Sequence, residues 1–236
     1  MLHRPHRSTD SRSNWQGVAD LMAGLMMIFL FIAVSYMESM KVQADHARTI
    51  AVAYKELQDD LYEDLYDEFQ DDLAGWMATI DRQTLSVRFQ EPSVLFTQGS
   101  ATVTPRFQAI LADFFPRYLR ILRSPDYRDS IEEIRIEGHT SSEWEADADA
   151  STVYFENMRL SQSRTTSVLR VCLGLLADQN DHAWARRFLT ANGLSSSRLI
   201  QGEGGNEDRL ASGRVEFRTR TAAENKVVEI IREIEK

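Results

Sequence analysis

The pattern of apolar and polar positions divides the chain into three parts, and the first is a long apolar run. Residues 17–36 read GVADLMAGLMMIFLFIAVSY and contain a single charged residue, Asp20. A helix rises about 1.5 Å per residue, so this run spans roughly 30 Å, the thickness of the hydrocarbon core of a bilayer. The pattern therefore predicts a membrane-spanning helix over residues 17–37, after a short polar tail at residues 1–16.

A cleaved signal peptide is the main alternative for this run, because Ala33-Val34-Ser35 could serve as a small-residue processing site. Against it, the run is longer than the usual apolar core of a signal peptide and has an acid inside it. The only cysteine, Cys172, lies far downstream, so the run has no lipobox cysteine for a lipoprotein anchor. One cysteine also forms no intrachain disulfide. We favour a retained membrane helix.

The second part, residues 38–80, has the pattern of a helix that continues out of the membrane. Apolar residues follow one another at steps of three or four along it, at Ile50, Tyr54, Leu57, Leu61, Leu65, Phe69 and Leu73. Acidic residues lie between them, at Asp59, Asp60, Glu63, Asp64, Asp67, Glu68, Asp71 and Asp72. We predict an amphipathic helical linker with a solvated acidic face. A bound cation such as calcium is the alternative, although the segment lacks the glycine-containing loop of an EF-hand.

The third part mixes two periodicities, which predicts one α+β sandwich over residues 81–221. Alternating apolar residues predict strands at 85–89, 94–96, 131–137 and 214–218. Helical patterns cover 107–122, 157–176 and 183–192, the last closed by Gly193. Residues 142–156 are polar and acidic and are interpreted as an inserted loop. Residues 222–236 form a short amphipathic C-terminal helix in this interpretation.

Charge limits the location and the class of partner. The formal net charge is -9, and no basic patch with interleaved aromatic residues occurs, which argues against a nucleic-acid function. Three arginines, Arg4, Arg7 and Arg12, precede the apolar run against one acid, Asp10. Basic residues favour the cytoplasmic side of a membrane helix. The chain is therefore expected to span the inner membrane once, with its N-terminus cytoplasmic and residues 38–236 in the periplasm.

Residues 94–218 carry a series of short motifs. They are Leu95-Phe96, Gly99-Ser100-Ala101, Thr104-Pro105, Ile136-Glu137-Gly138-His139-Thr140, Asn157-Met158-Arg159-Leu160-Ser161, Arg164-Thr165-Thr166-Ser167-Val168, Gly193-Leu194, Gly202-Glu203-Gly204 and Arg214-Val215-Glu216. In this order they resemble the OmpA-like peptidoglycan-binding domain, over nearly the whole of the third part. The resemblance implies an OmpA-like α+β sandwich that binds the cell wall.

The same resemblance implies a set of peptidoglycan-binding residues. In the family, an aspartate after the Gly-His-Thr run and an arginine after the Leu-Ser run hold the diaminopimelate of the peptide stem. Arg164 matches that arginine, whose guanidinium can hold a carboxylate through two hydrogen bonds, and Asn157 and Leu160 match residues that shape the pocket. The aspartate position holds Ser141. A serine cannot neutralise an ammonium, so affinity is in question; Glu143 or an acid of residues 145–149 is a candidate replacement.

The apolar run has a second resemblance. Val18-Ala19-Asp20-Leu21-Met22, Leu25-Met26 and Phe29-Leu30 resemble the membrane helix of MotB-type stator subunits, which pair with a MotA-like partner in ion-driven rotary motors. An acid near the cytoplasmic end of the helix, a linker and an OmpA-like domain repeat the plan of those subunits. The short tail, the acidic post-membrane helix and the altered peptidoglycan motif most resemble the B subunits of Zorya anti-phage systems.

Asp20 is the candidate ion-translocating residue. An aspartate in a membrane helix costs roughly 2.5–3.5 kcal/mol on insertion scales, so it marks a function by default. A side chain that only reaches back to the cytoplasmic interface is the alternative. Gly17 and Gly24 share a helix face with Asp20, and glycines allow another helix to approach closely. A carboxylate that alternates between a dry and an aqueous surface can take up and release a cation, most simply a proton; the sequence leaves sodium open.

The stator resemblance implies particular partners. Two B-type helices stand inside a ring of five A-type subunits in that family, so we expect a homodimer within a pentameric ZorA/MotA-like membrane subunit. The chain has no phosphate-binding glycine-rich loop, nucleophile triad or metal-ligand cluster, so neither an enzyme nor a cofactor other than the transported cation is expected. Cys172, Trp76 and Trp184 are assigned to packing. A flagellar-type stator subunit, and a static membrane-to-wall anchor without ion flow, are the competing hypotheses.

Overall fold

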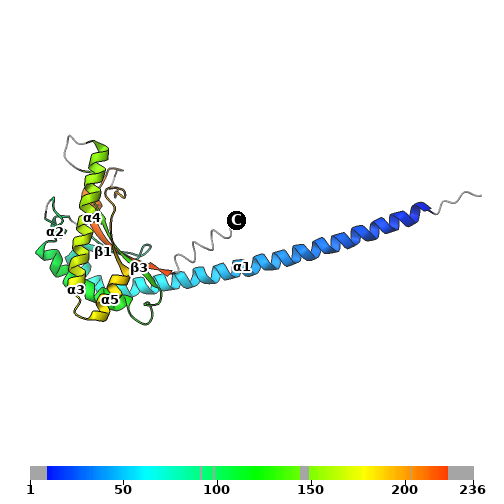
Figure 1. The fold of residues 1–236 in the computed structure, drawn as a ribbon, viewed down its shortest axis with the longest axis horizontal. Coiled ribbons are helices and arrows are strands. Elements are labelled where there is room, and N and C mark those ends of the chain that lie inside the picture. Colours follow the sequence, from blue (N-terminus) through cyan, green and yellow to red (C-terminus); the bar gives the residue numbers. More distant parts are fainter. Residues whose placement is uncertain (1–9, 91, 98, 144–148, 203, 223–236) are drawn as a thin grey trace, which may run out of the picture. The chain divides into compact units, whose positions relative to one another are not determined.

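The computed structural model describes residues 10–90, 92–97, 99–143, 149–202 and 204–222. Contacts divide the chain into two units, residues 1–51 and 52–236, and each is described by itself. The elements, coloured along the sequence in Figure 1, are α1 (Asp10–Trp76), β1 (Ala78–Asp81), β2 (Ser86–Phe89), α2 (Pro92–Leu95), α3 (Pro105–Leu122), β3 (Ile131–His139), α4 (Ala150–Gly174), α5 (Gln179–Phe188), β4 (Leu189–Gly193), α6 (Arg209–Ser212) and β5 (Arg214–Thr221).

The first unit contains the membrane-spanning stretch of α1. Its most apolar 18-residue window has a mean hydropathy of 2.3, and no part of that window is buried within the chain. Large apolar side chains point outward on all sides of this stretch; Leu21 and Phe31, for example, are 73% and 78% exposed. A helix that is apolar all round requires an apolar surrounding, either lipid or partner helices. The structure thus agrees with the predicted helix over residues 17–37.

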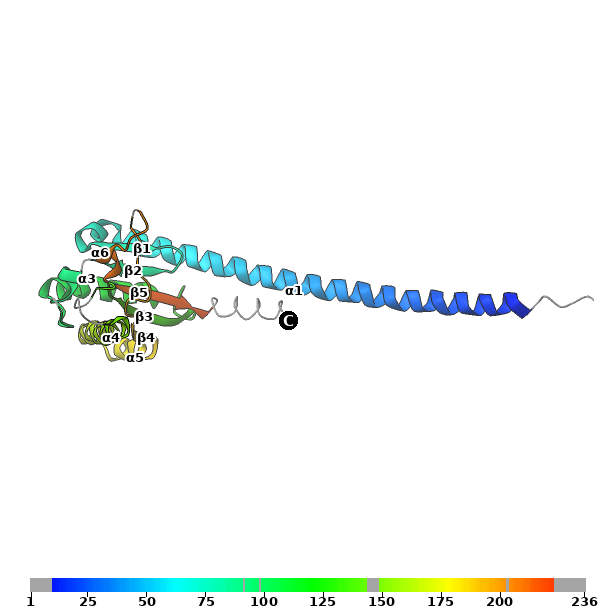
Figure 2. The same ribbon diagram turned by 90° about the horizontal axis from the view of Figure 1, so that it is seen from above.

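The second unit is built on a five-stranded mixed sheet. Its strands are ordered β1-β2-β5-β3-β4, as Figure 2 shows, and only β3 and β4 run parallel. Successive side chains of a strand point to opposite faces. Val215 and Phe217 of β5 therefore enter the apolar core, whereas Arg214 and Glu216 face the other side of the sheet. One face is apolar and covered by helices, and the other carries charges.

Helix α4 packs unusually closely on the parallel strand pair. Gly138 of β3 and Gly193 of β4 lie opposite each other in the register. A Cβ atom on Gly138 would lie 2.6 Å from Thr165 Cγ2, and one on Gly193 would lie 2.4 Å from the backbone nitrogen of Gln162. Any side chain at these two positions would push the helix away. The glycines thus fix the position of α4 over the ends of β3 and β4.

The end of α1 belongs to the hydrophobic core of the second unit. Leu61, Leu65 and Phe69 lie on one helix face and are all fully buried. The ring of Phe69 lies 5.2 Å from that of Phe114 on α3, whose own ring lies 5.1 Å from Phe217 of β5. The apolar seam predicted in the linker is therefore confirmed, and its partner is the domain itself. Residues 61–76 are a structural part of the sandwich.

Arg117 of α3 adds several polar contacts to the end of α1. Arg117 donates from Nε to Glu68 Oε1 at 2.7 Å, and from Nη1 to Asp72 Oδ2 at 2.8 Å. Its guanidinium also lies 4.9 Å from the centre of the Phe69 ring. Asp59 pairs with Arg82 at 2.9 Å. Part of the acidic face is thus engaged within the domain, where the sequence predicted it to be solvated.

Two predicted boundaries in the first half of the domain are wrong. The helix predicted to reach residue 80 ends at Trp76, where Met77 takes a positive φ of 52°, and strand β1 follows at once and pairs with β2. The strand predicted at 94–96 is instead the short helix α2, with Phe96 in an isolated bridge to Val103. Pro92 opens that turn, because proline suits the first position of a helix.

Two further boundaries are wrong in the second half. Residues 150–156 were predicted as loop, but they form the first turns of α4, whose N-cap Asp149 accepts from the backbone N–H groups of Ser151 and Thr152. The helix predicted over 183–192 ends at Phe188, and residues 189–193 form β4. Gly193 therefore belongs to a strand that pairs with β3. The predicted C-terminal helix and Arg4 and Arg7 lie outside the described residues.

Replacement of Phe69 by alanine tests whether the end of α1 is part of the core. Because the ring is fully buried among aromatic side chains, we expect Phe69→Ala to lower the free energy of unfolding by about 3–5 kcal/mol. Urea unfolding of the detergent-solubilised chain, followed by near-ultraviolet circular dichroism, measures the change. The control is Tyr66→Ala on the same helix, whose ring is 42% exposed; it should cost less than about 1 kcal/mol. Equal effects would contradict the assignment.

Candidate functional site

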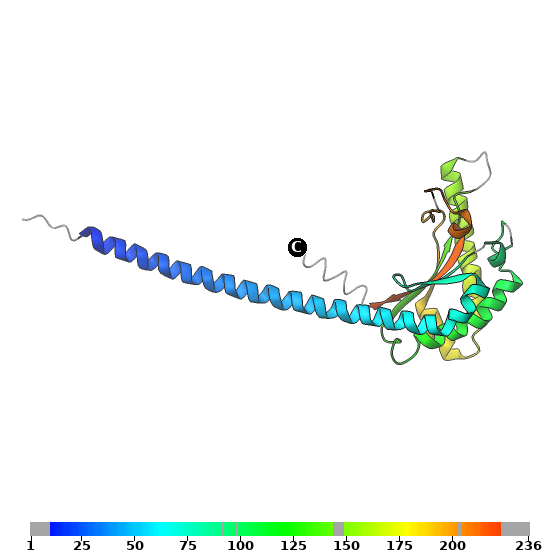
Figure 3. The same ribbon diagram turned by 180° about the vertical axis from the view of Figure 1, so that it is seen from behind.

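The residues predicted to bind peptidoglycan lie on α4 and on the loop that follows β3. Asn157, Leu160 and Arg164 are spaced by three and four positions, so they share one helix face. Ser141 comes two residues after the end of β3. The close packing of α4 at Gly138 brings this loop to the first half of the helix. Figure 3 shows that end of the sheet from the side opposite to Figure 1.

Asn157 connects the helix to the loop. It is 2% exposed, and its Nδ2 donates to the backbone oxygen of Ser141 at 3.4 Å. Ser195 Oγ, from the segment after β4, donates to the backbone oxygen of Tyr154 at 2.8 Å. Thr140 N donates to Ser195 O at 3.0 Å. The first turns of α4 and the loop after β3 are therefore held together through backbone groups.

Neighbouring groups of the domain fix the side chain of Arg164. Its Nε donates to the backbone oxygen of Ser100 at 3.0 Å, and its guanidinium lies 4.8 Å from the centre of the Phe96 ring. Burial lowers the pKa of Arg164 from its ordinary value. Among the described residues, no carboxylate lies within ion-pair distance of it. A half-buried guanidinium held by a carbonyl and an aromatic ring keeps its remaining N–H donors for the carboxylate of a ligand.

An open cleft adjoins Arg164. Its volume is about 340 Å³, and its wall includes Ser100, Thr102, Ser167 and Arg170. Ser100 is also the residue whose carbonyl holds Arg164. The candidate site therefore follows α4 from Asn157 past Arg164 toward an open cleft with a mixed polar and apolar wall.

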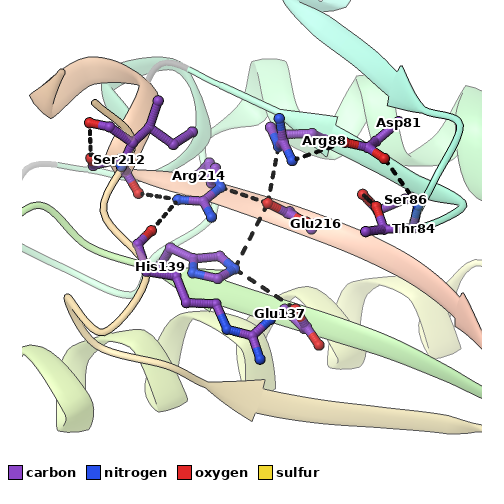
Figure 4. Close-up of polar contacts among 11 residues, drawn as sticks. Asp81, Thr84, Ser86, Arg88, Glu137, His139, Ser212, Arg214 and Glu216 are labelled. Carbon is purple, nitrogen blue, oxygen red and sulfur yellow. Dashed lines mark hydrogen bonds and ion pairs between the residues drawn. The ribbon is translucent and has the colours of Figure 1, made fainter. Parts of the chain in front are cut away.

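A second polar cluster, which the sequence analysis did not identify, lies on the charged face of the sheet (Figure 4). Glu137, His139 and Glu216 place one ligand atom each within 4.8 Å of one another, and all three residues are buried. Glu137 and Glu216 lie directly opposite each other on β3 and β5. Two carboxylates in that position repel each other unless cations compensate.

Arginines supply the compensating charge in this cluster. Arg214 Nε donates to Glu216 Oε1 at 2.6 Å and Arg88 Nε donates to the same oxygen at 2.9 Å, while Arg198 lies 3.7 Å from Glu137. Three positive charges around two carboxylates disfavour a bound metal cation. The arrangement instead fits a charge-balanced network that joins β2, β3 and β5. The alternation of IEEIRIEGH predicts which face these residues share, but not their burial.

The network shifts two pKa values. Burial lowers the pKa of His139 to about 3, and the charge of Arg214 acts in the same direction. Burial by itself would raise the pKa of Glu216, but the hydrogen bond from Arg214 and the charge of Arg88 lower it to about 2. At neutral pH the imidazole of His139 is therefore neutral, and it lies beside the carboxylate of Glu216, which is paired with arginines.

Asp20 lies in the first unit, on the exposed surface of α1. Gly17 and Gly24 share its helix face, and a Cβ atom added at either glycine would meet nothing within 4 Å. The chain by itself thus leaves an open surface on both sides of the carboxylate. Such a surface suits close approach by another helix.

Known proteins share the fold of the second unit. No family model matches the chain. The crystal structure of a putative MotB-like protein from Desulfovibrio vulgaris has a TM-score of 0.51 and 25% identity, covering 71% of this chain and 96% of that one. The cell wall anchor of the T6SS from Pseudomonas aeruginosa reaches a TM-score of 0.46 at 21% identity, with coverage of 66% and 96%.

The long apolar N-terminal helix and the mixed sheet domain thus define a MotB-like protein with an OmpA-like domain. The Zorya protein ZorB of Escherichia coli (strain Crooks) is 42% identical over 229 residues, which is 97% of this chain and 96% of that protein. The chain belongs to the ZorB family. The resemblance to Zorya B subunits expected from the sequence is confirmed, and the roles of Asp20, Ser141, Asn157, Leu160 and Arg164 stay predictions.

Acid should destabilise the domain through His139. The folded-state pKa of about 3 lies below the ordinary value of 6.5, so the unfolded chain binds more protons between these pH values. The contribution of His139 to the free energy of unfolding is therefore fully present above about pH 6.5 and is lost as the pH falls toward 3. The slope from this group approaches about 1.4 kcal/mol per pH unit. Urea unfolding at several pH values measures the slope.

The His139→Gln variant should show a shallower slope in that window, because glutamine does not titrate. His46→Gln, a change at an exposed histidine of α1, is the matched control and should leave the slope as it is. A slope that His139→Gln leaves unchanged would contradict the buried neutral imidazole.

Proposed function

We propose that this protein is the wall-anchored B subunit of an ion-driven motor, most simply proton-driven, that acts with a ZorA-like membrane partner in anti-phage defence. The observation that carries the proposal is the joining, in one chain of the ZorB family, of a membrane-helix carboxylate to an OmpA-like domain. The proposed role is mechanical and needs no catalytic centre in this chain. The proposal requires two features: a domain that binds peptidoglycan, called the wall grip below, and a carboxylate that carries an ion.

The wall grip is supported by the geometry around Arg164. The guanidinium is oriented by Ser100 and Phe96 and has no acid of the described chain to neutralise it. A carboxylate of a peptide stem is a suitable partner for such a group. Asn157 and Ser141 lie in contact on the same side of the domain. In this proposal the domain holds peptidoglycan in the periplasm and keeps the membrane helix from rotating.

The ion-carrying role of Asp20 is supported by its surroundings in the sequence. It is the one charged residue among residues 17–36, and the glycines on its face leave room for a partner helix. A carboxylate that a dry partner surface neutralises and an aqueous path ionises can pass one cation per cycle. We further propose that two copies of this chain stand inside a ring of five ZorA-like subunits, so that ion passage turns the ring against the anchored dimer.

The experiment is the plating efficiency of phage on cells that carry the complete defence operon. We expect Asp20→Asn to abolish protection, because an amide cannot bind and release a cation, while the amount of protein in the membrane stays the same. The control is Asp45→Asn, which alters an exposed acid of α1 beyond the apolar run and should protect as the unchanged chain does. Full protection by Asp20→Asn would leave the static wall anchor as the function.

A further inference from the structure

The candidate wall site has a guanidinium, at Arg164, and a serine where the resemblance leads one to expect an acid. Arg164 suits the carboxylate of an amino-acid ligand, and a neighbouring ammonium of that ligand would need an anion. Ser141 offers only a hydroxyl. A carboxylate at this loop that no cation of the described chain neutralises could supply that charge.

Two acids suggested by the sequence are engaged elsewhere. Glu143 Oε1 accepts from Arg209 Nη1 at 2.6 Å, so its charge is compensated. Asp149 is the N-cap of α4; its Oδ1 accepts from Ser151 N at 3.0 Å, and these local hydrogen bonds lower its pKa. Glu145 and Asp147 lie outside the described residues.

A third acid, Glu207, lies at the same loop and comes from a distant segment of the chain. Its Oε1 accepts from Ser142 N at 3.0 Å, and its Oε2 is hydrogen bonded to Ser142 Oγ. An isolated bridge between Gln201 and Glu207 and a hydrogen bond from Asp208 N to Ile200 O at 2.8 Å fix the backbone of this segment.

The carboxylate of Glu207 is positioned but not neutralised. It is half-buried, and within the described part of the chain no arginine, lysine or histidine lies at ion-pair distance from it. Among the described residues, its two hydrogen bonds are to Ser142. The neighbouring Ser141 accepts a hydrogen bond from Asn157 through its backbone oxygen. A carboxylate accepts about four hydrogen bonds, so Glu207 keeps capacity for a ligand.

We propose that Glu207 supplies the negative charge of the wall site and binds an ammonium of the peptide stem, while Arg164 binds a carboxylate of the same stem. The domain then recognises the peptide stem through two residues of opposite charge on different segments, α4 and the segment before α6. This inference rests on the proposed function, because it names how the wall site reads its ligand.

The test measures binding of the full-length chain in detergent to purified diaminopimelate-containing sacculi. Glu207→Gln keeps an oxygen for Ser142 N but removes the charge. Losing one charge-assisted contact should weaken binding about tenfold. Glu143→Gln, whose acid is paired with Arg209, is the matched control and should bind within about twofold of the unchanged chain. Arg164→Ala should weaken binding as well.

Sacculi with acetylated amines separate a charge contact from a structural role. Acetylation removes the ammonium, so the unchanged chain should bind acetylated sacculi only as well as Glu207→Gln does. The variant itself should bind native and acetylated sacculi equally well. If Glu207→Gln binds native sacculi like the unchanged chain, or stays about tenfold weaker on acetylated sacculi too, the inference is wrong and wall binding stands. If the unchanged chain and Arg164→Ala both fail to bind native sacculi, the proposed wall grip itself is wrong.

Discussion

The close contact of α4 with the parallel pair β3 and β4 is the constraint on which the wall domain depends. Two glycines, Gly138 and Gly193, face each other under the helix, and a Cβ atom at either would overlap α4 or its side chains. The contact places Asn157 against the loop that follows β3 and places Arg164 against Ser100. The residues predicted to bind peptidoglycan are thus positioned by the close approach of α4 to the backbones of β3 and β4. Larger side chains at the two glycine positions would prevent this approach.

The packing of the last part of α1 within the second unit is a second constraint. The last part of α1 is buried in the core through Leu61, Leu65 and Phe69, and Arg117 of α3 binds its acidic side. The sequence predicts this segment as a linker, but its last part is a structural element of the domain. In an anchored motor subunit, such burial would transmit load from the wall domain to the helix through packed side chains.

Local patterns predicted most of the fold, and the errors have physical causes. The apolar seam of α1 and the strands at β2, β3 and β5 follow from periodicity. The residues of strand β4 were predicted as the end of a helix. They form a strand because they pair with β3, and a local sequence pattern carries no information about that contact. Of the site, the structure brings Asn157 and Ser141 into contact, and their role in binding peptidoglycan stays a prediction. Glu207 was not found, because its approach to Ser142 requires two segments distant in sequence.

The central claim is that a single chain joins the membrane carboxylate to the wall, and that the wall grip is needed for defence. The most direct measurement is the plating efficiency of phage on cells whose defence operon carries Arg164→Ala, with Asp20 intact and membrane levels matched. The account predicts that protection is lost, because an unanchored helix would turn with its partner ring. Full protection with a chain that no longer binds sacculi would contradict the anchored-motor account.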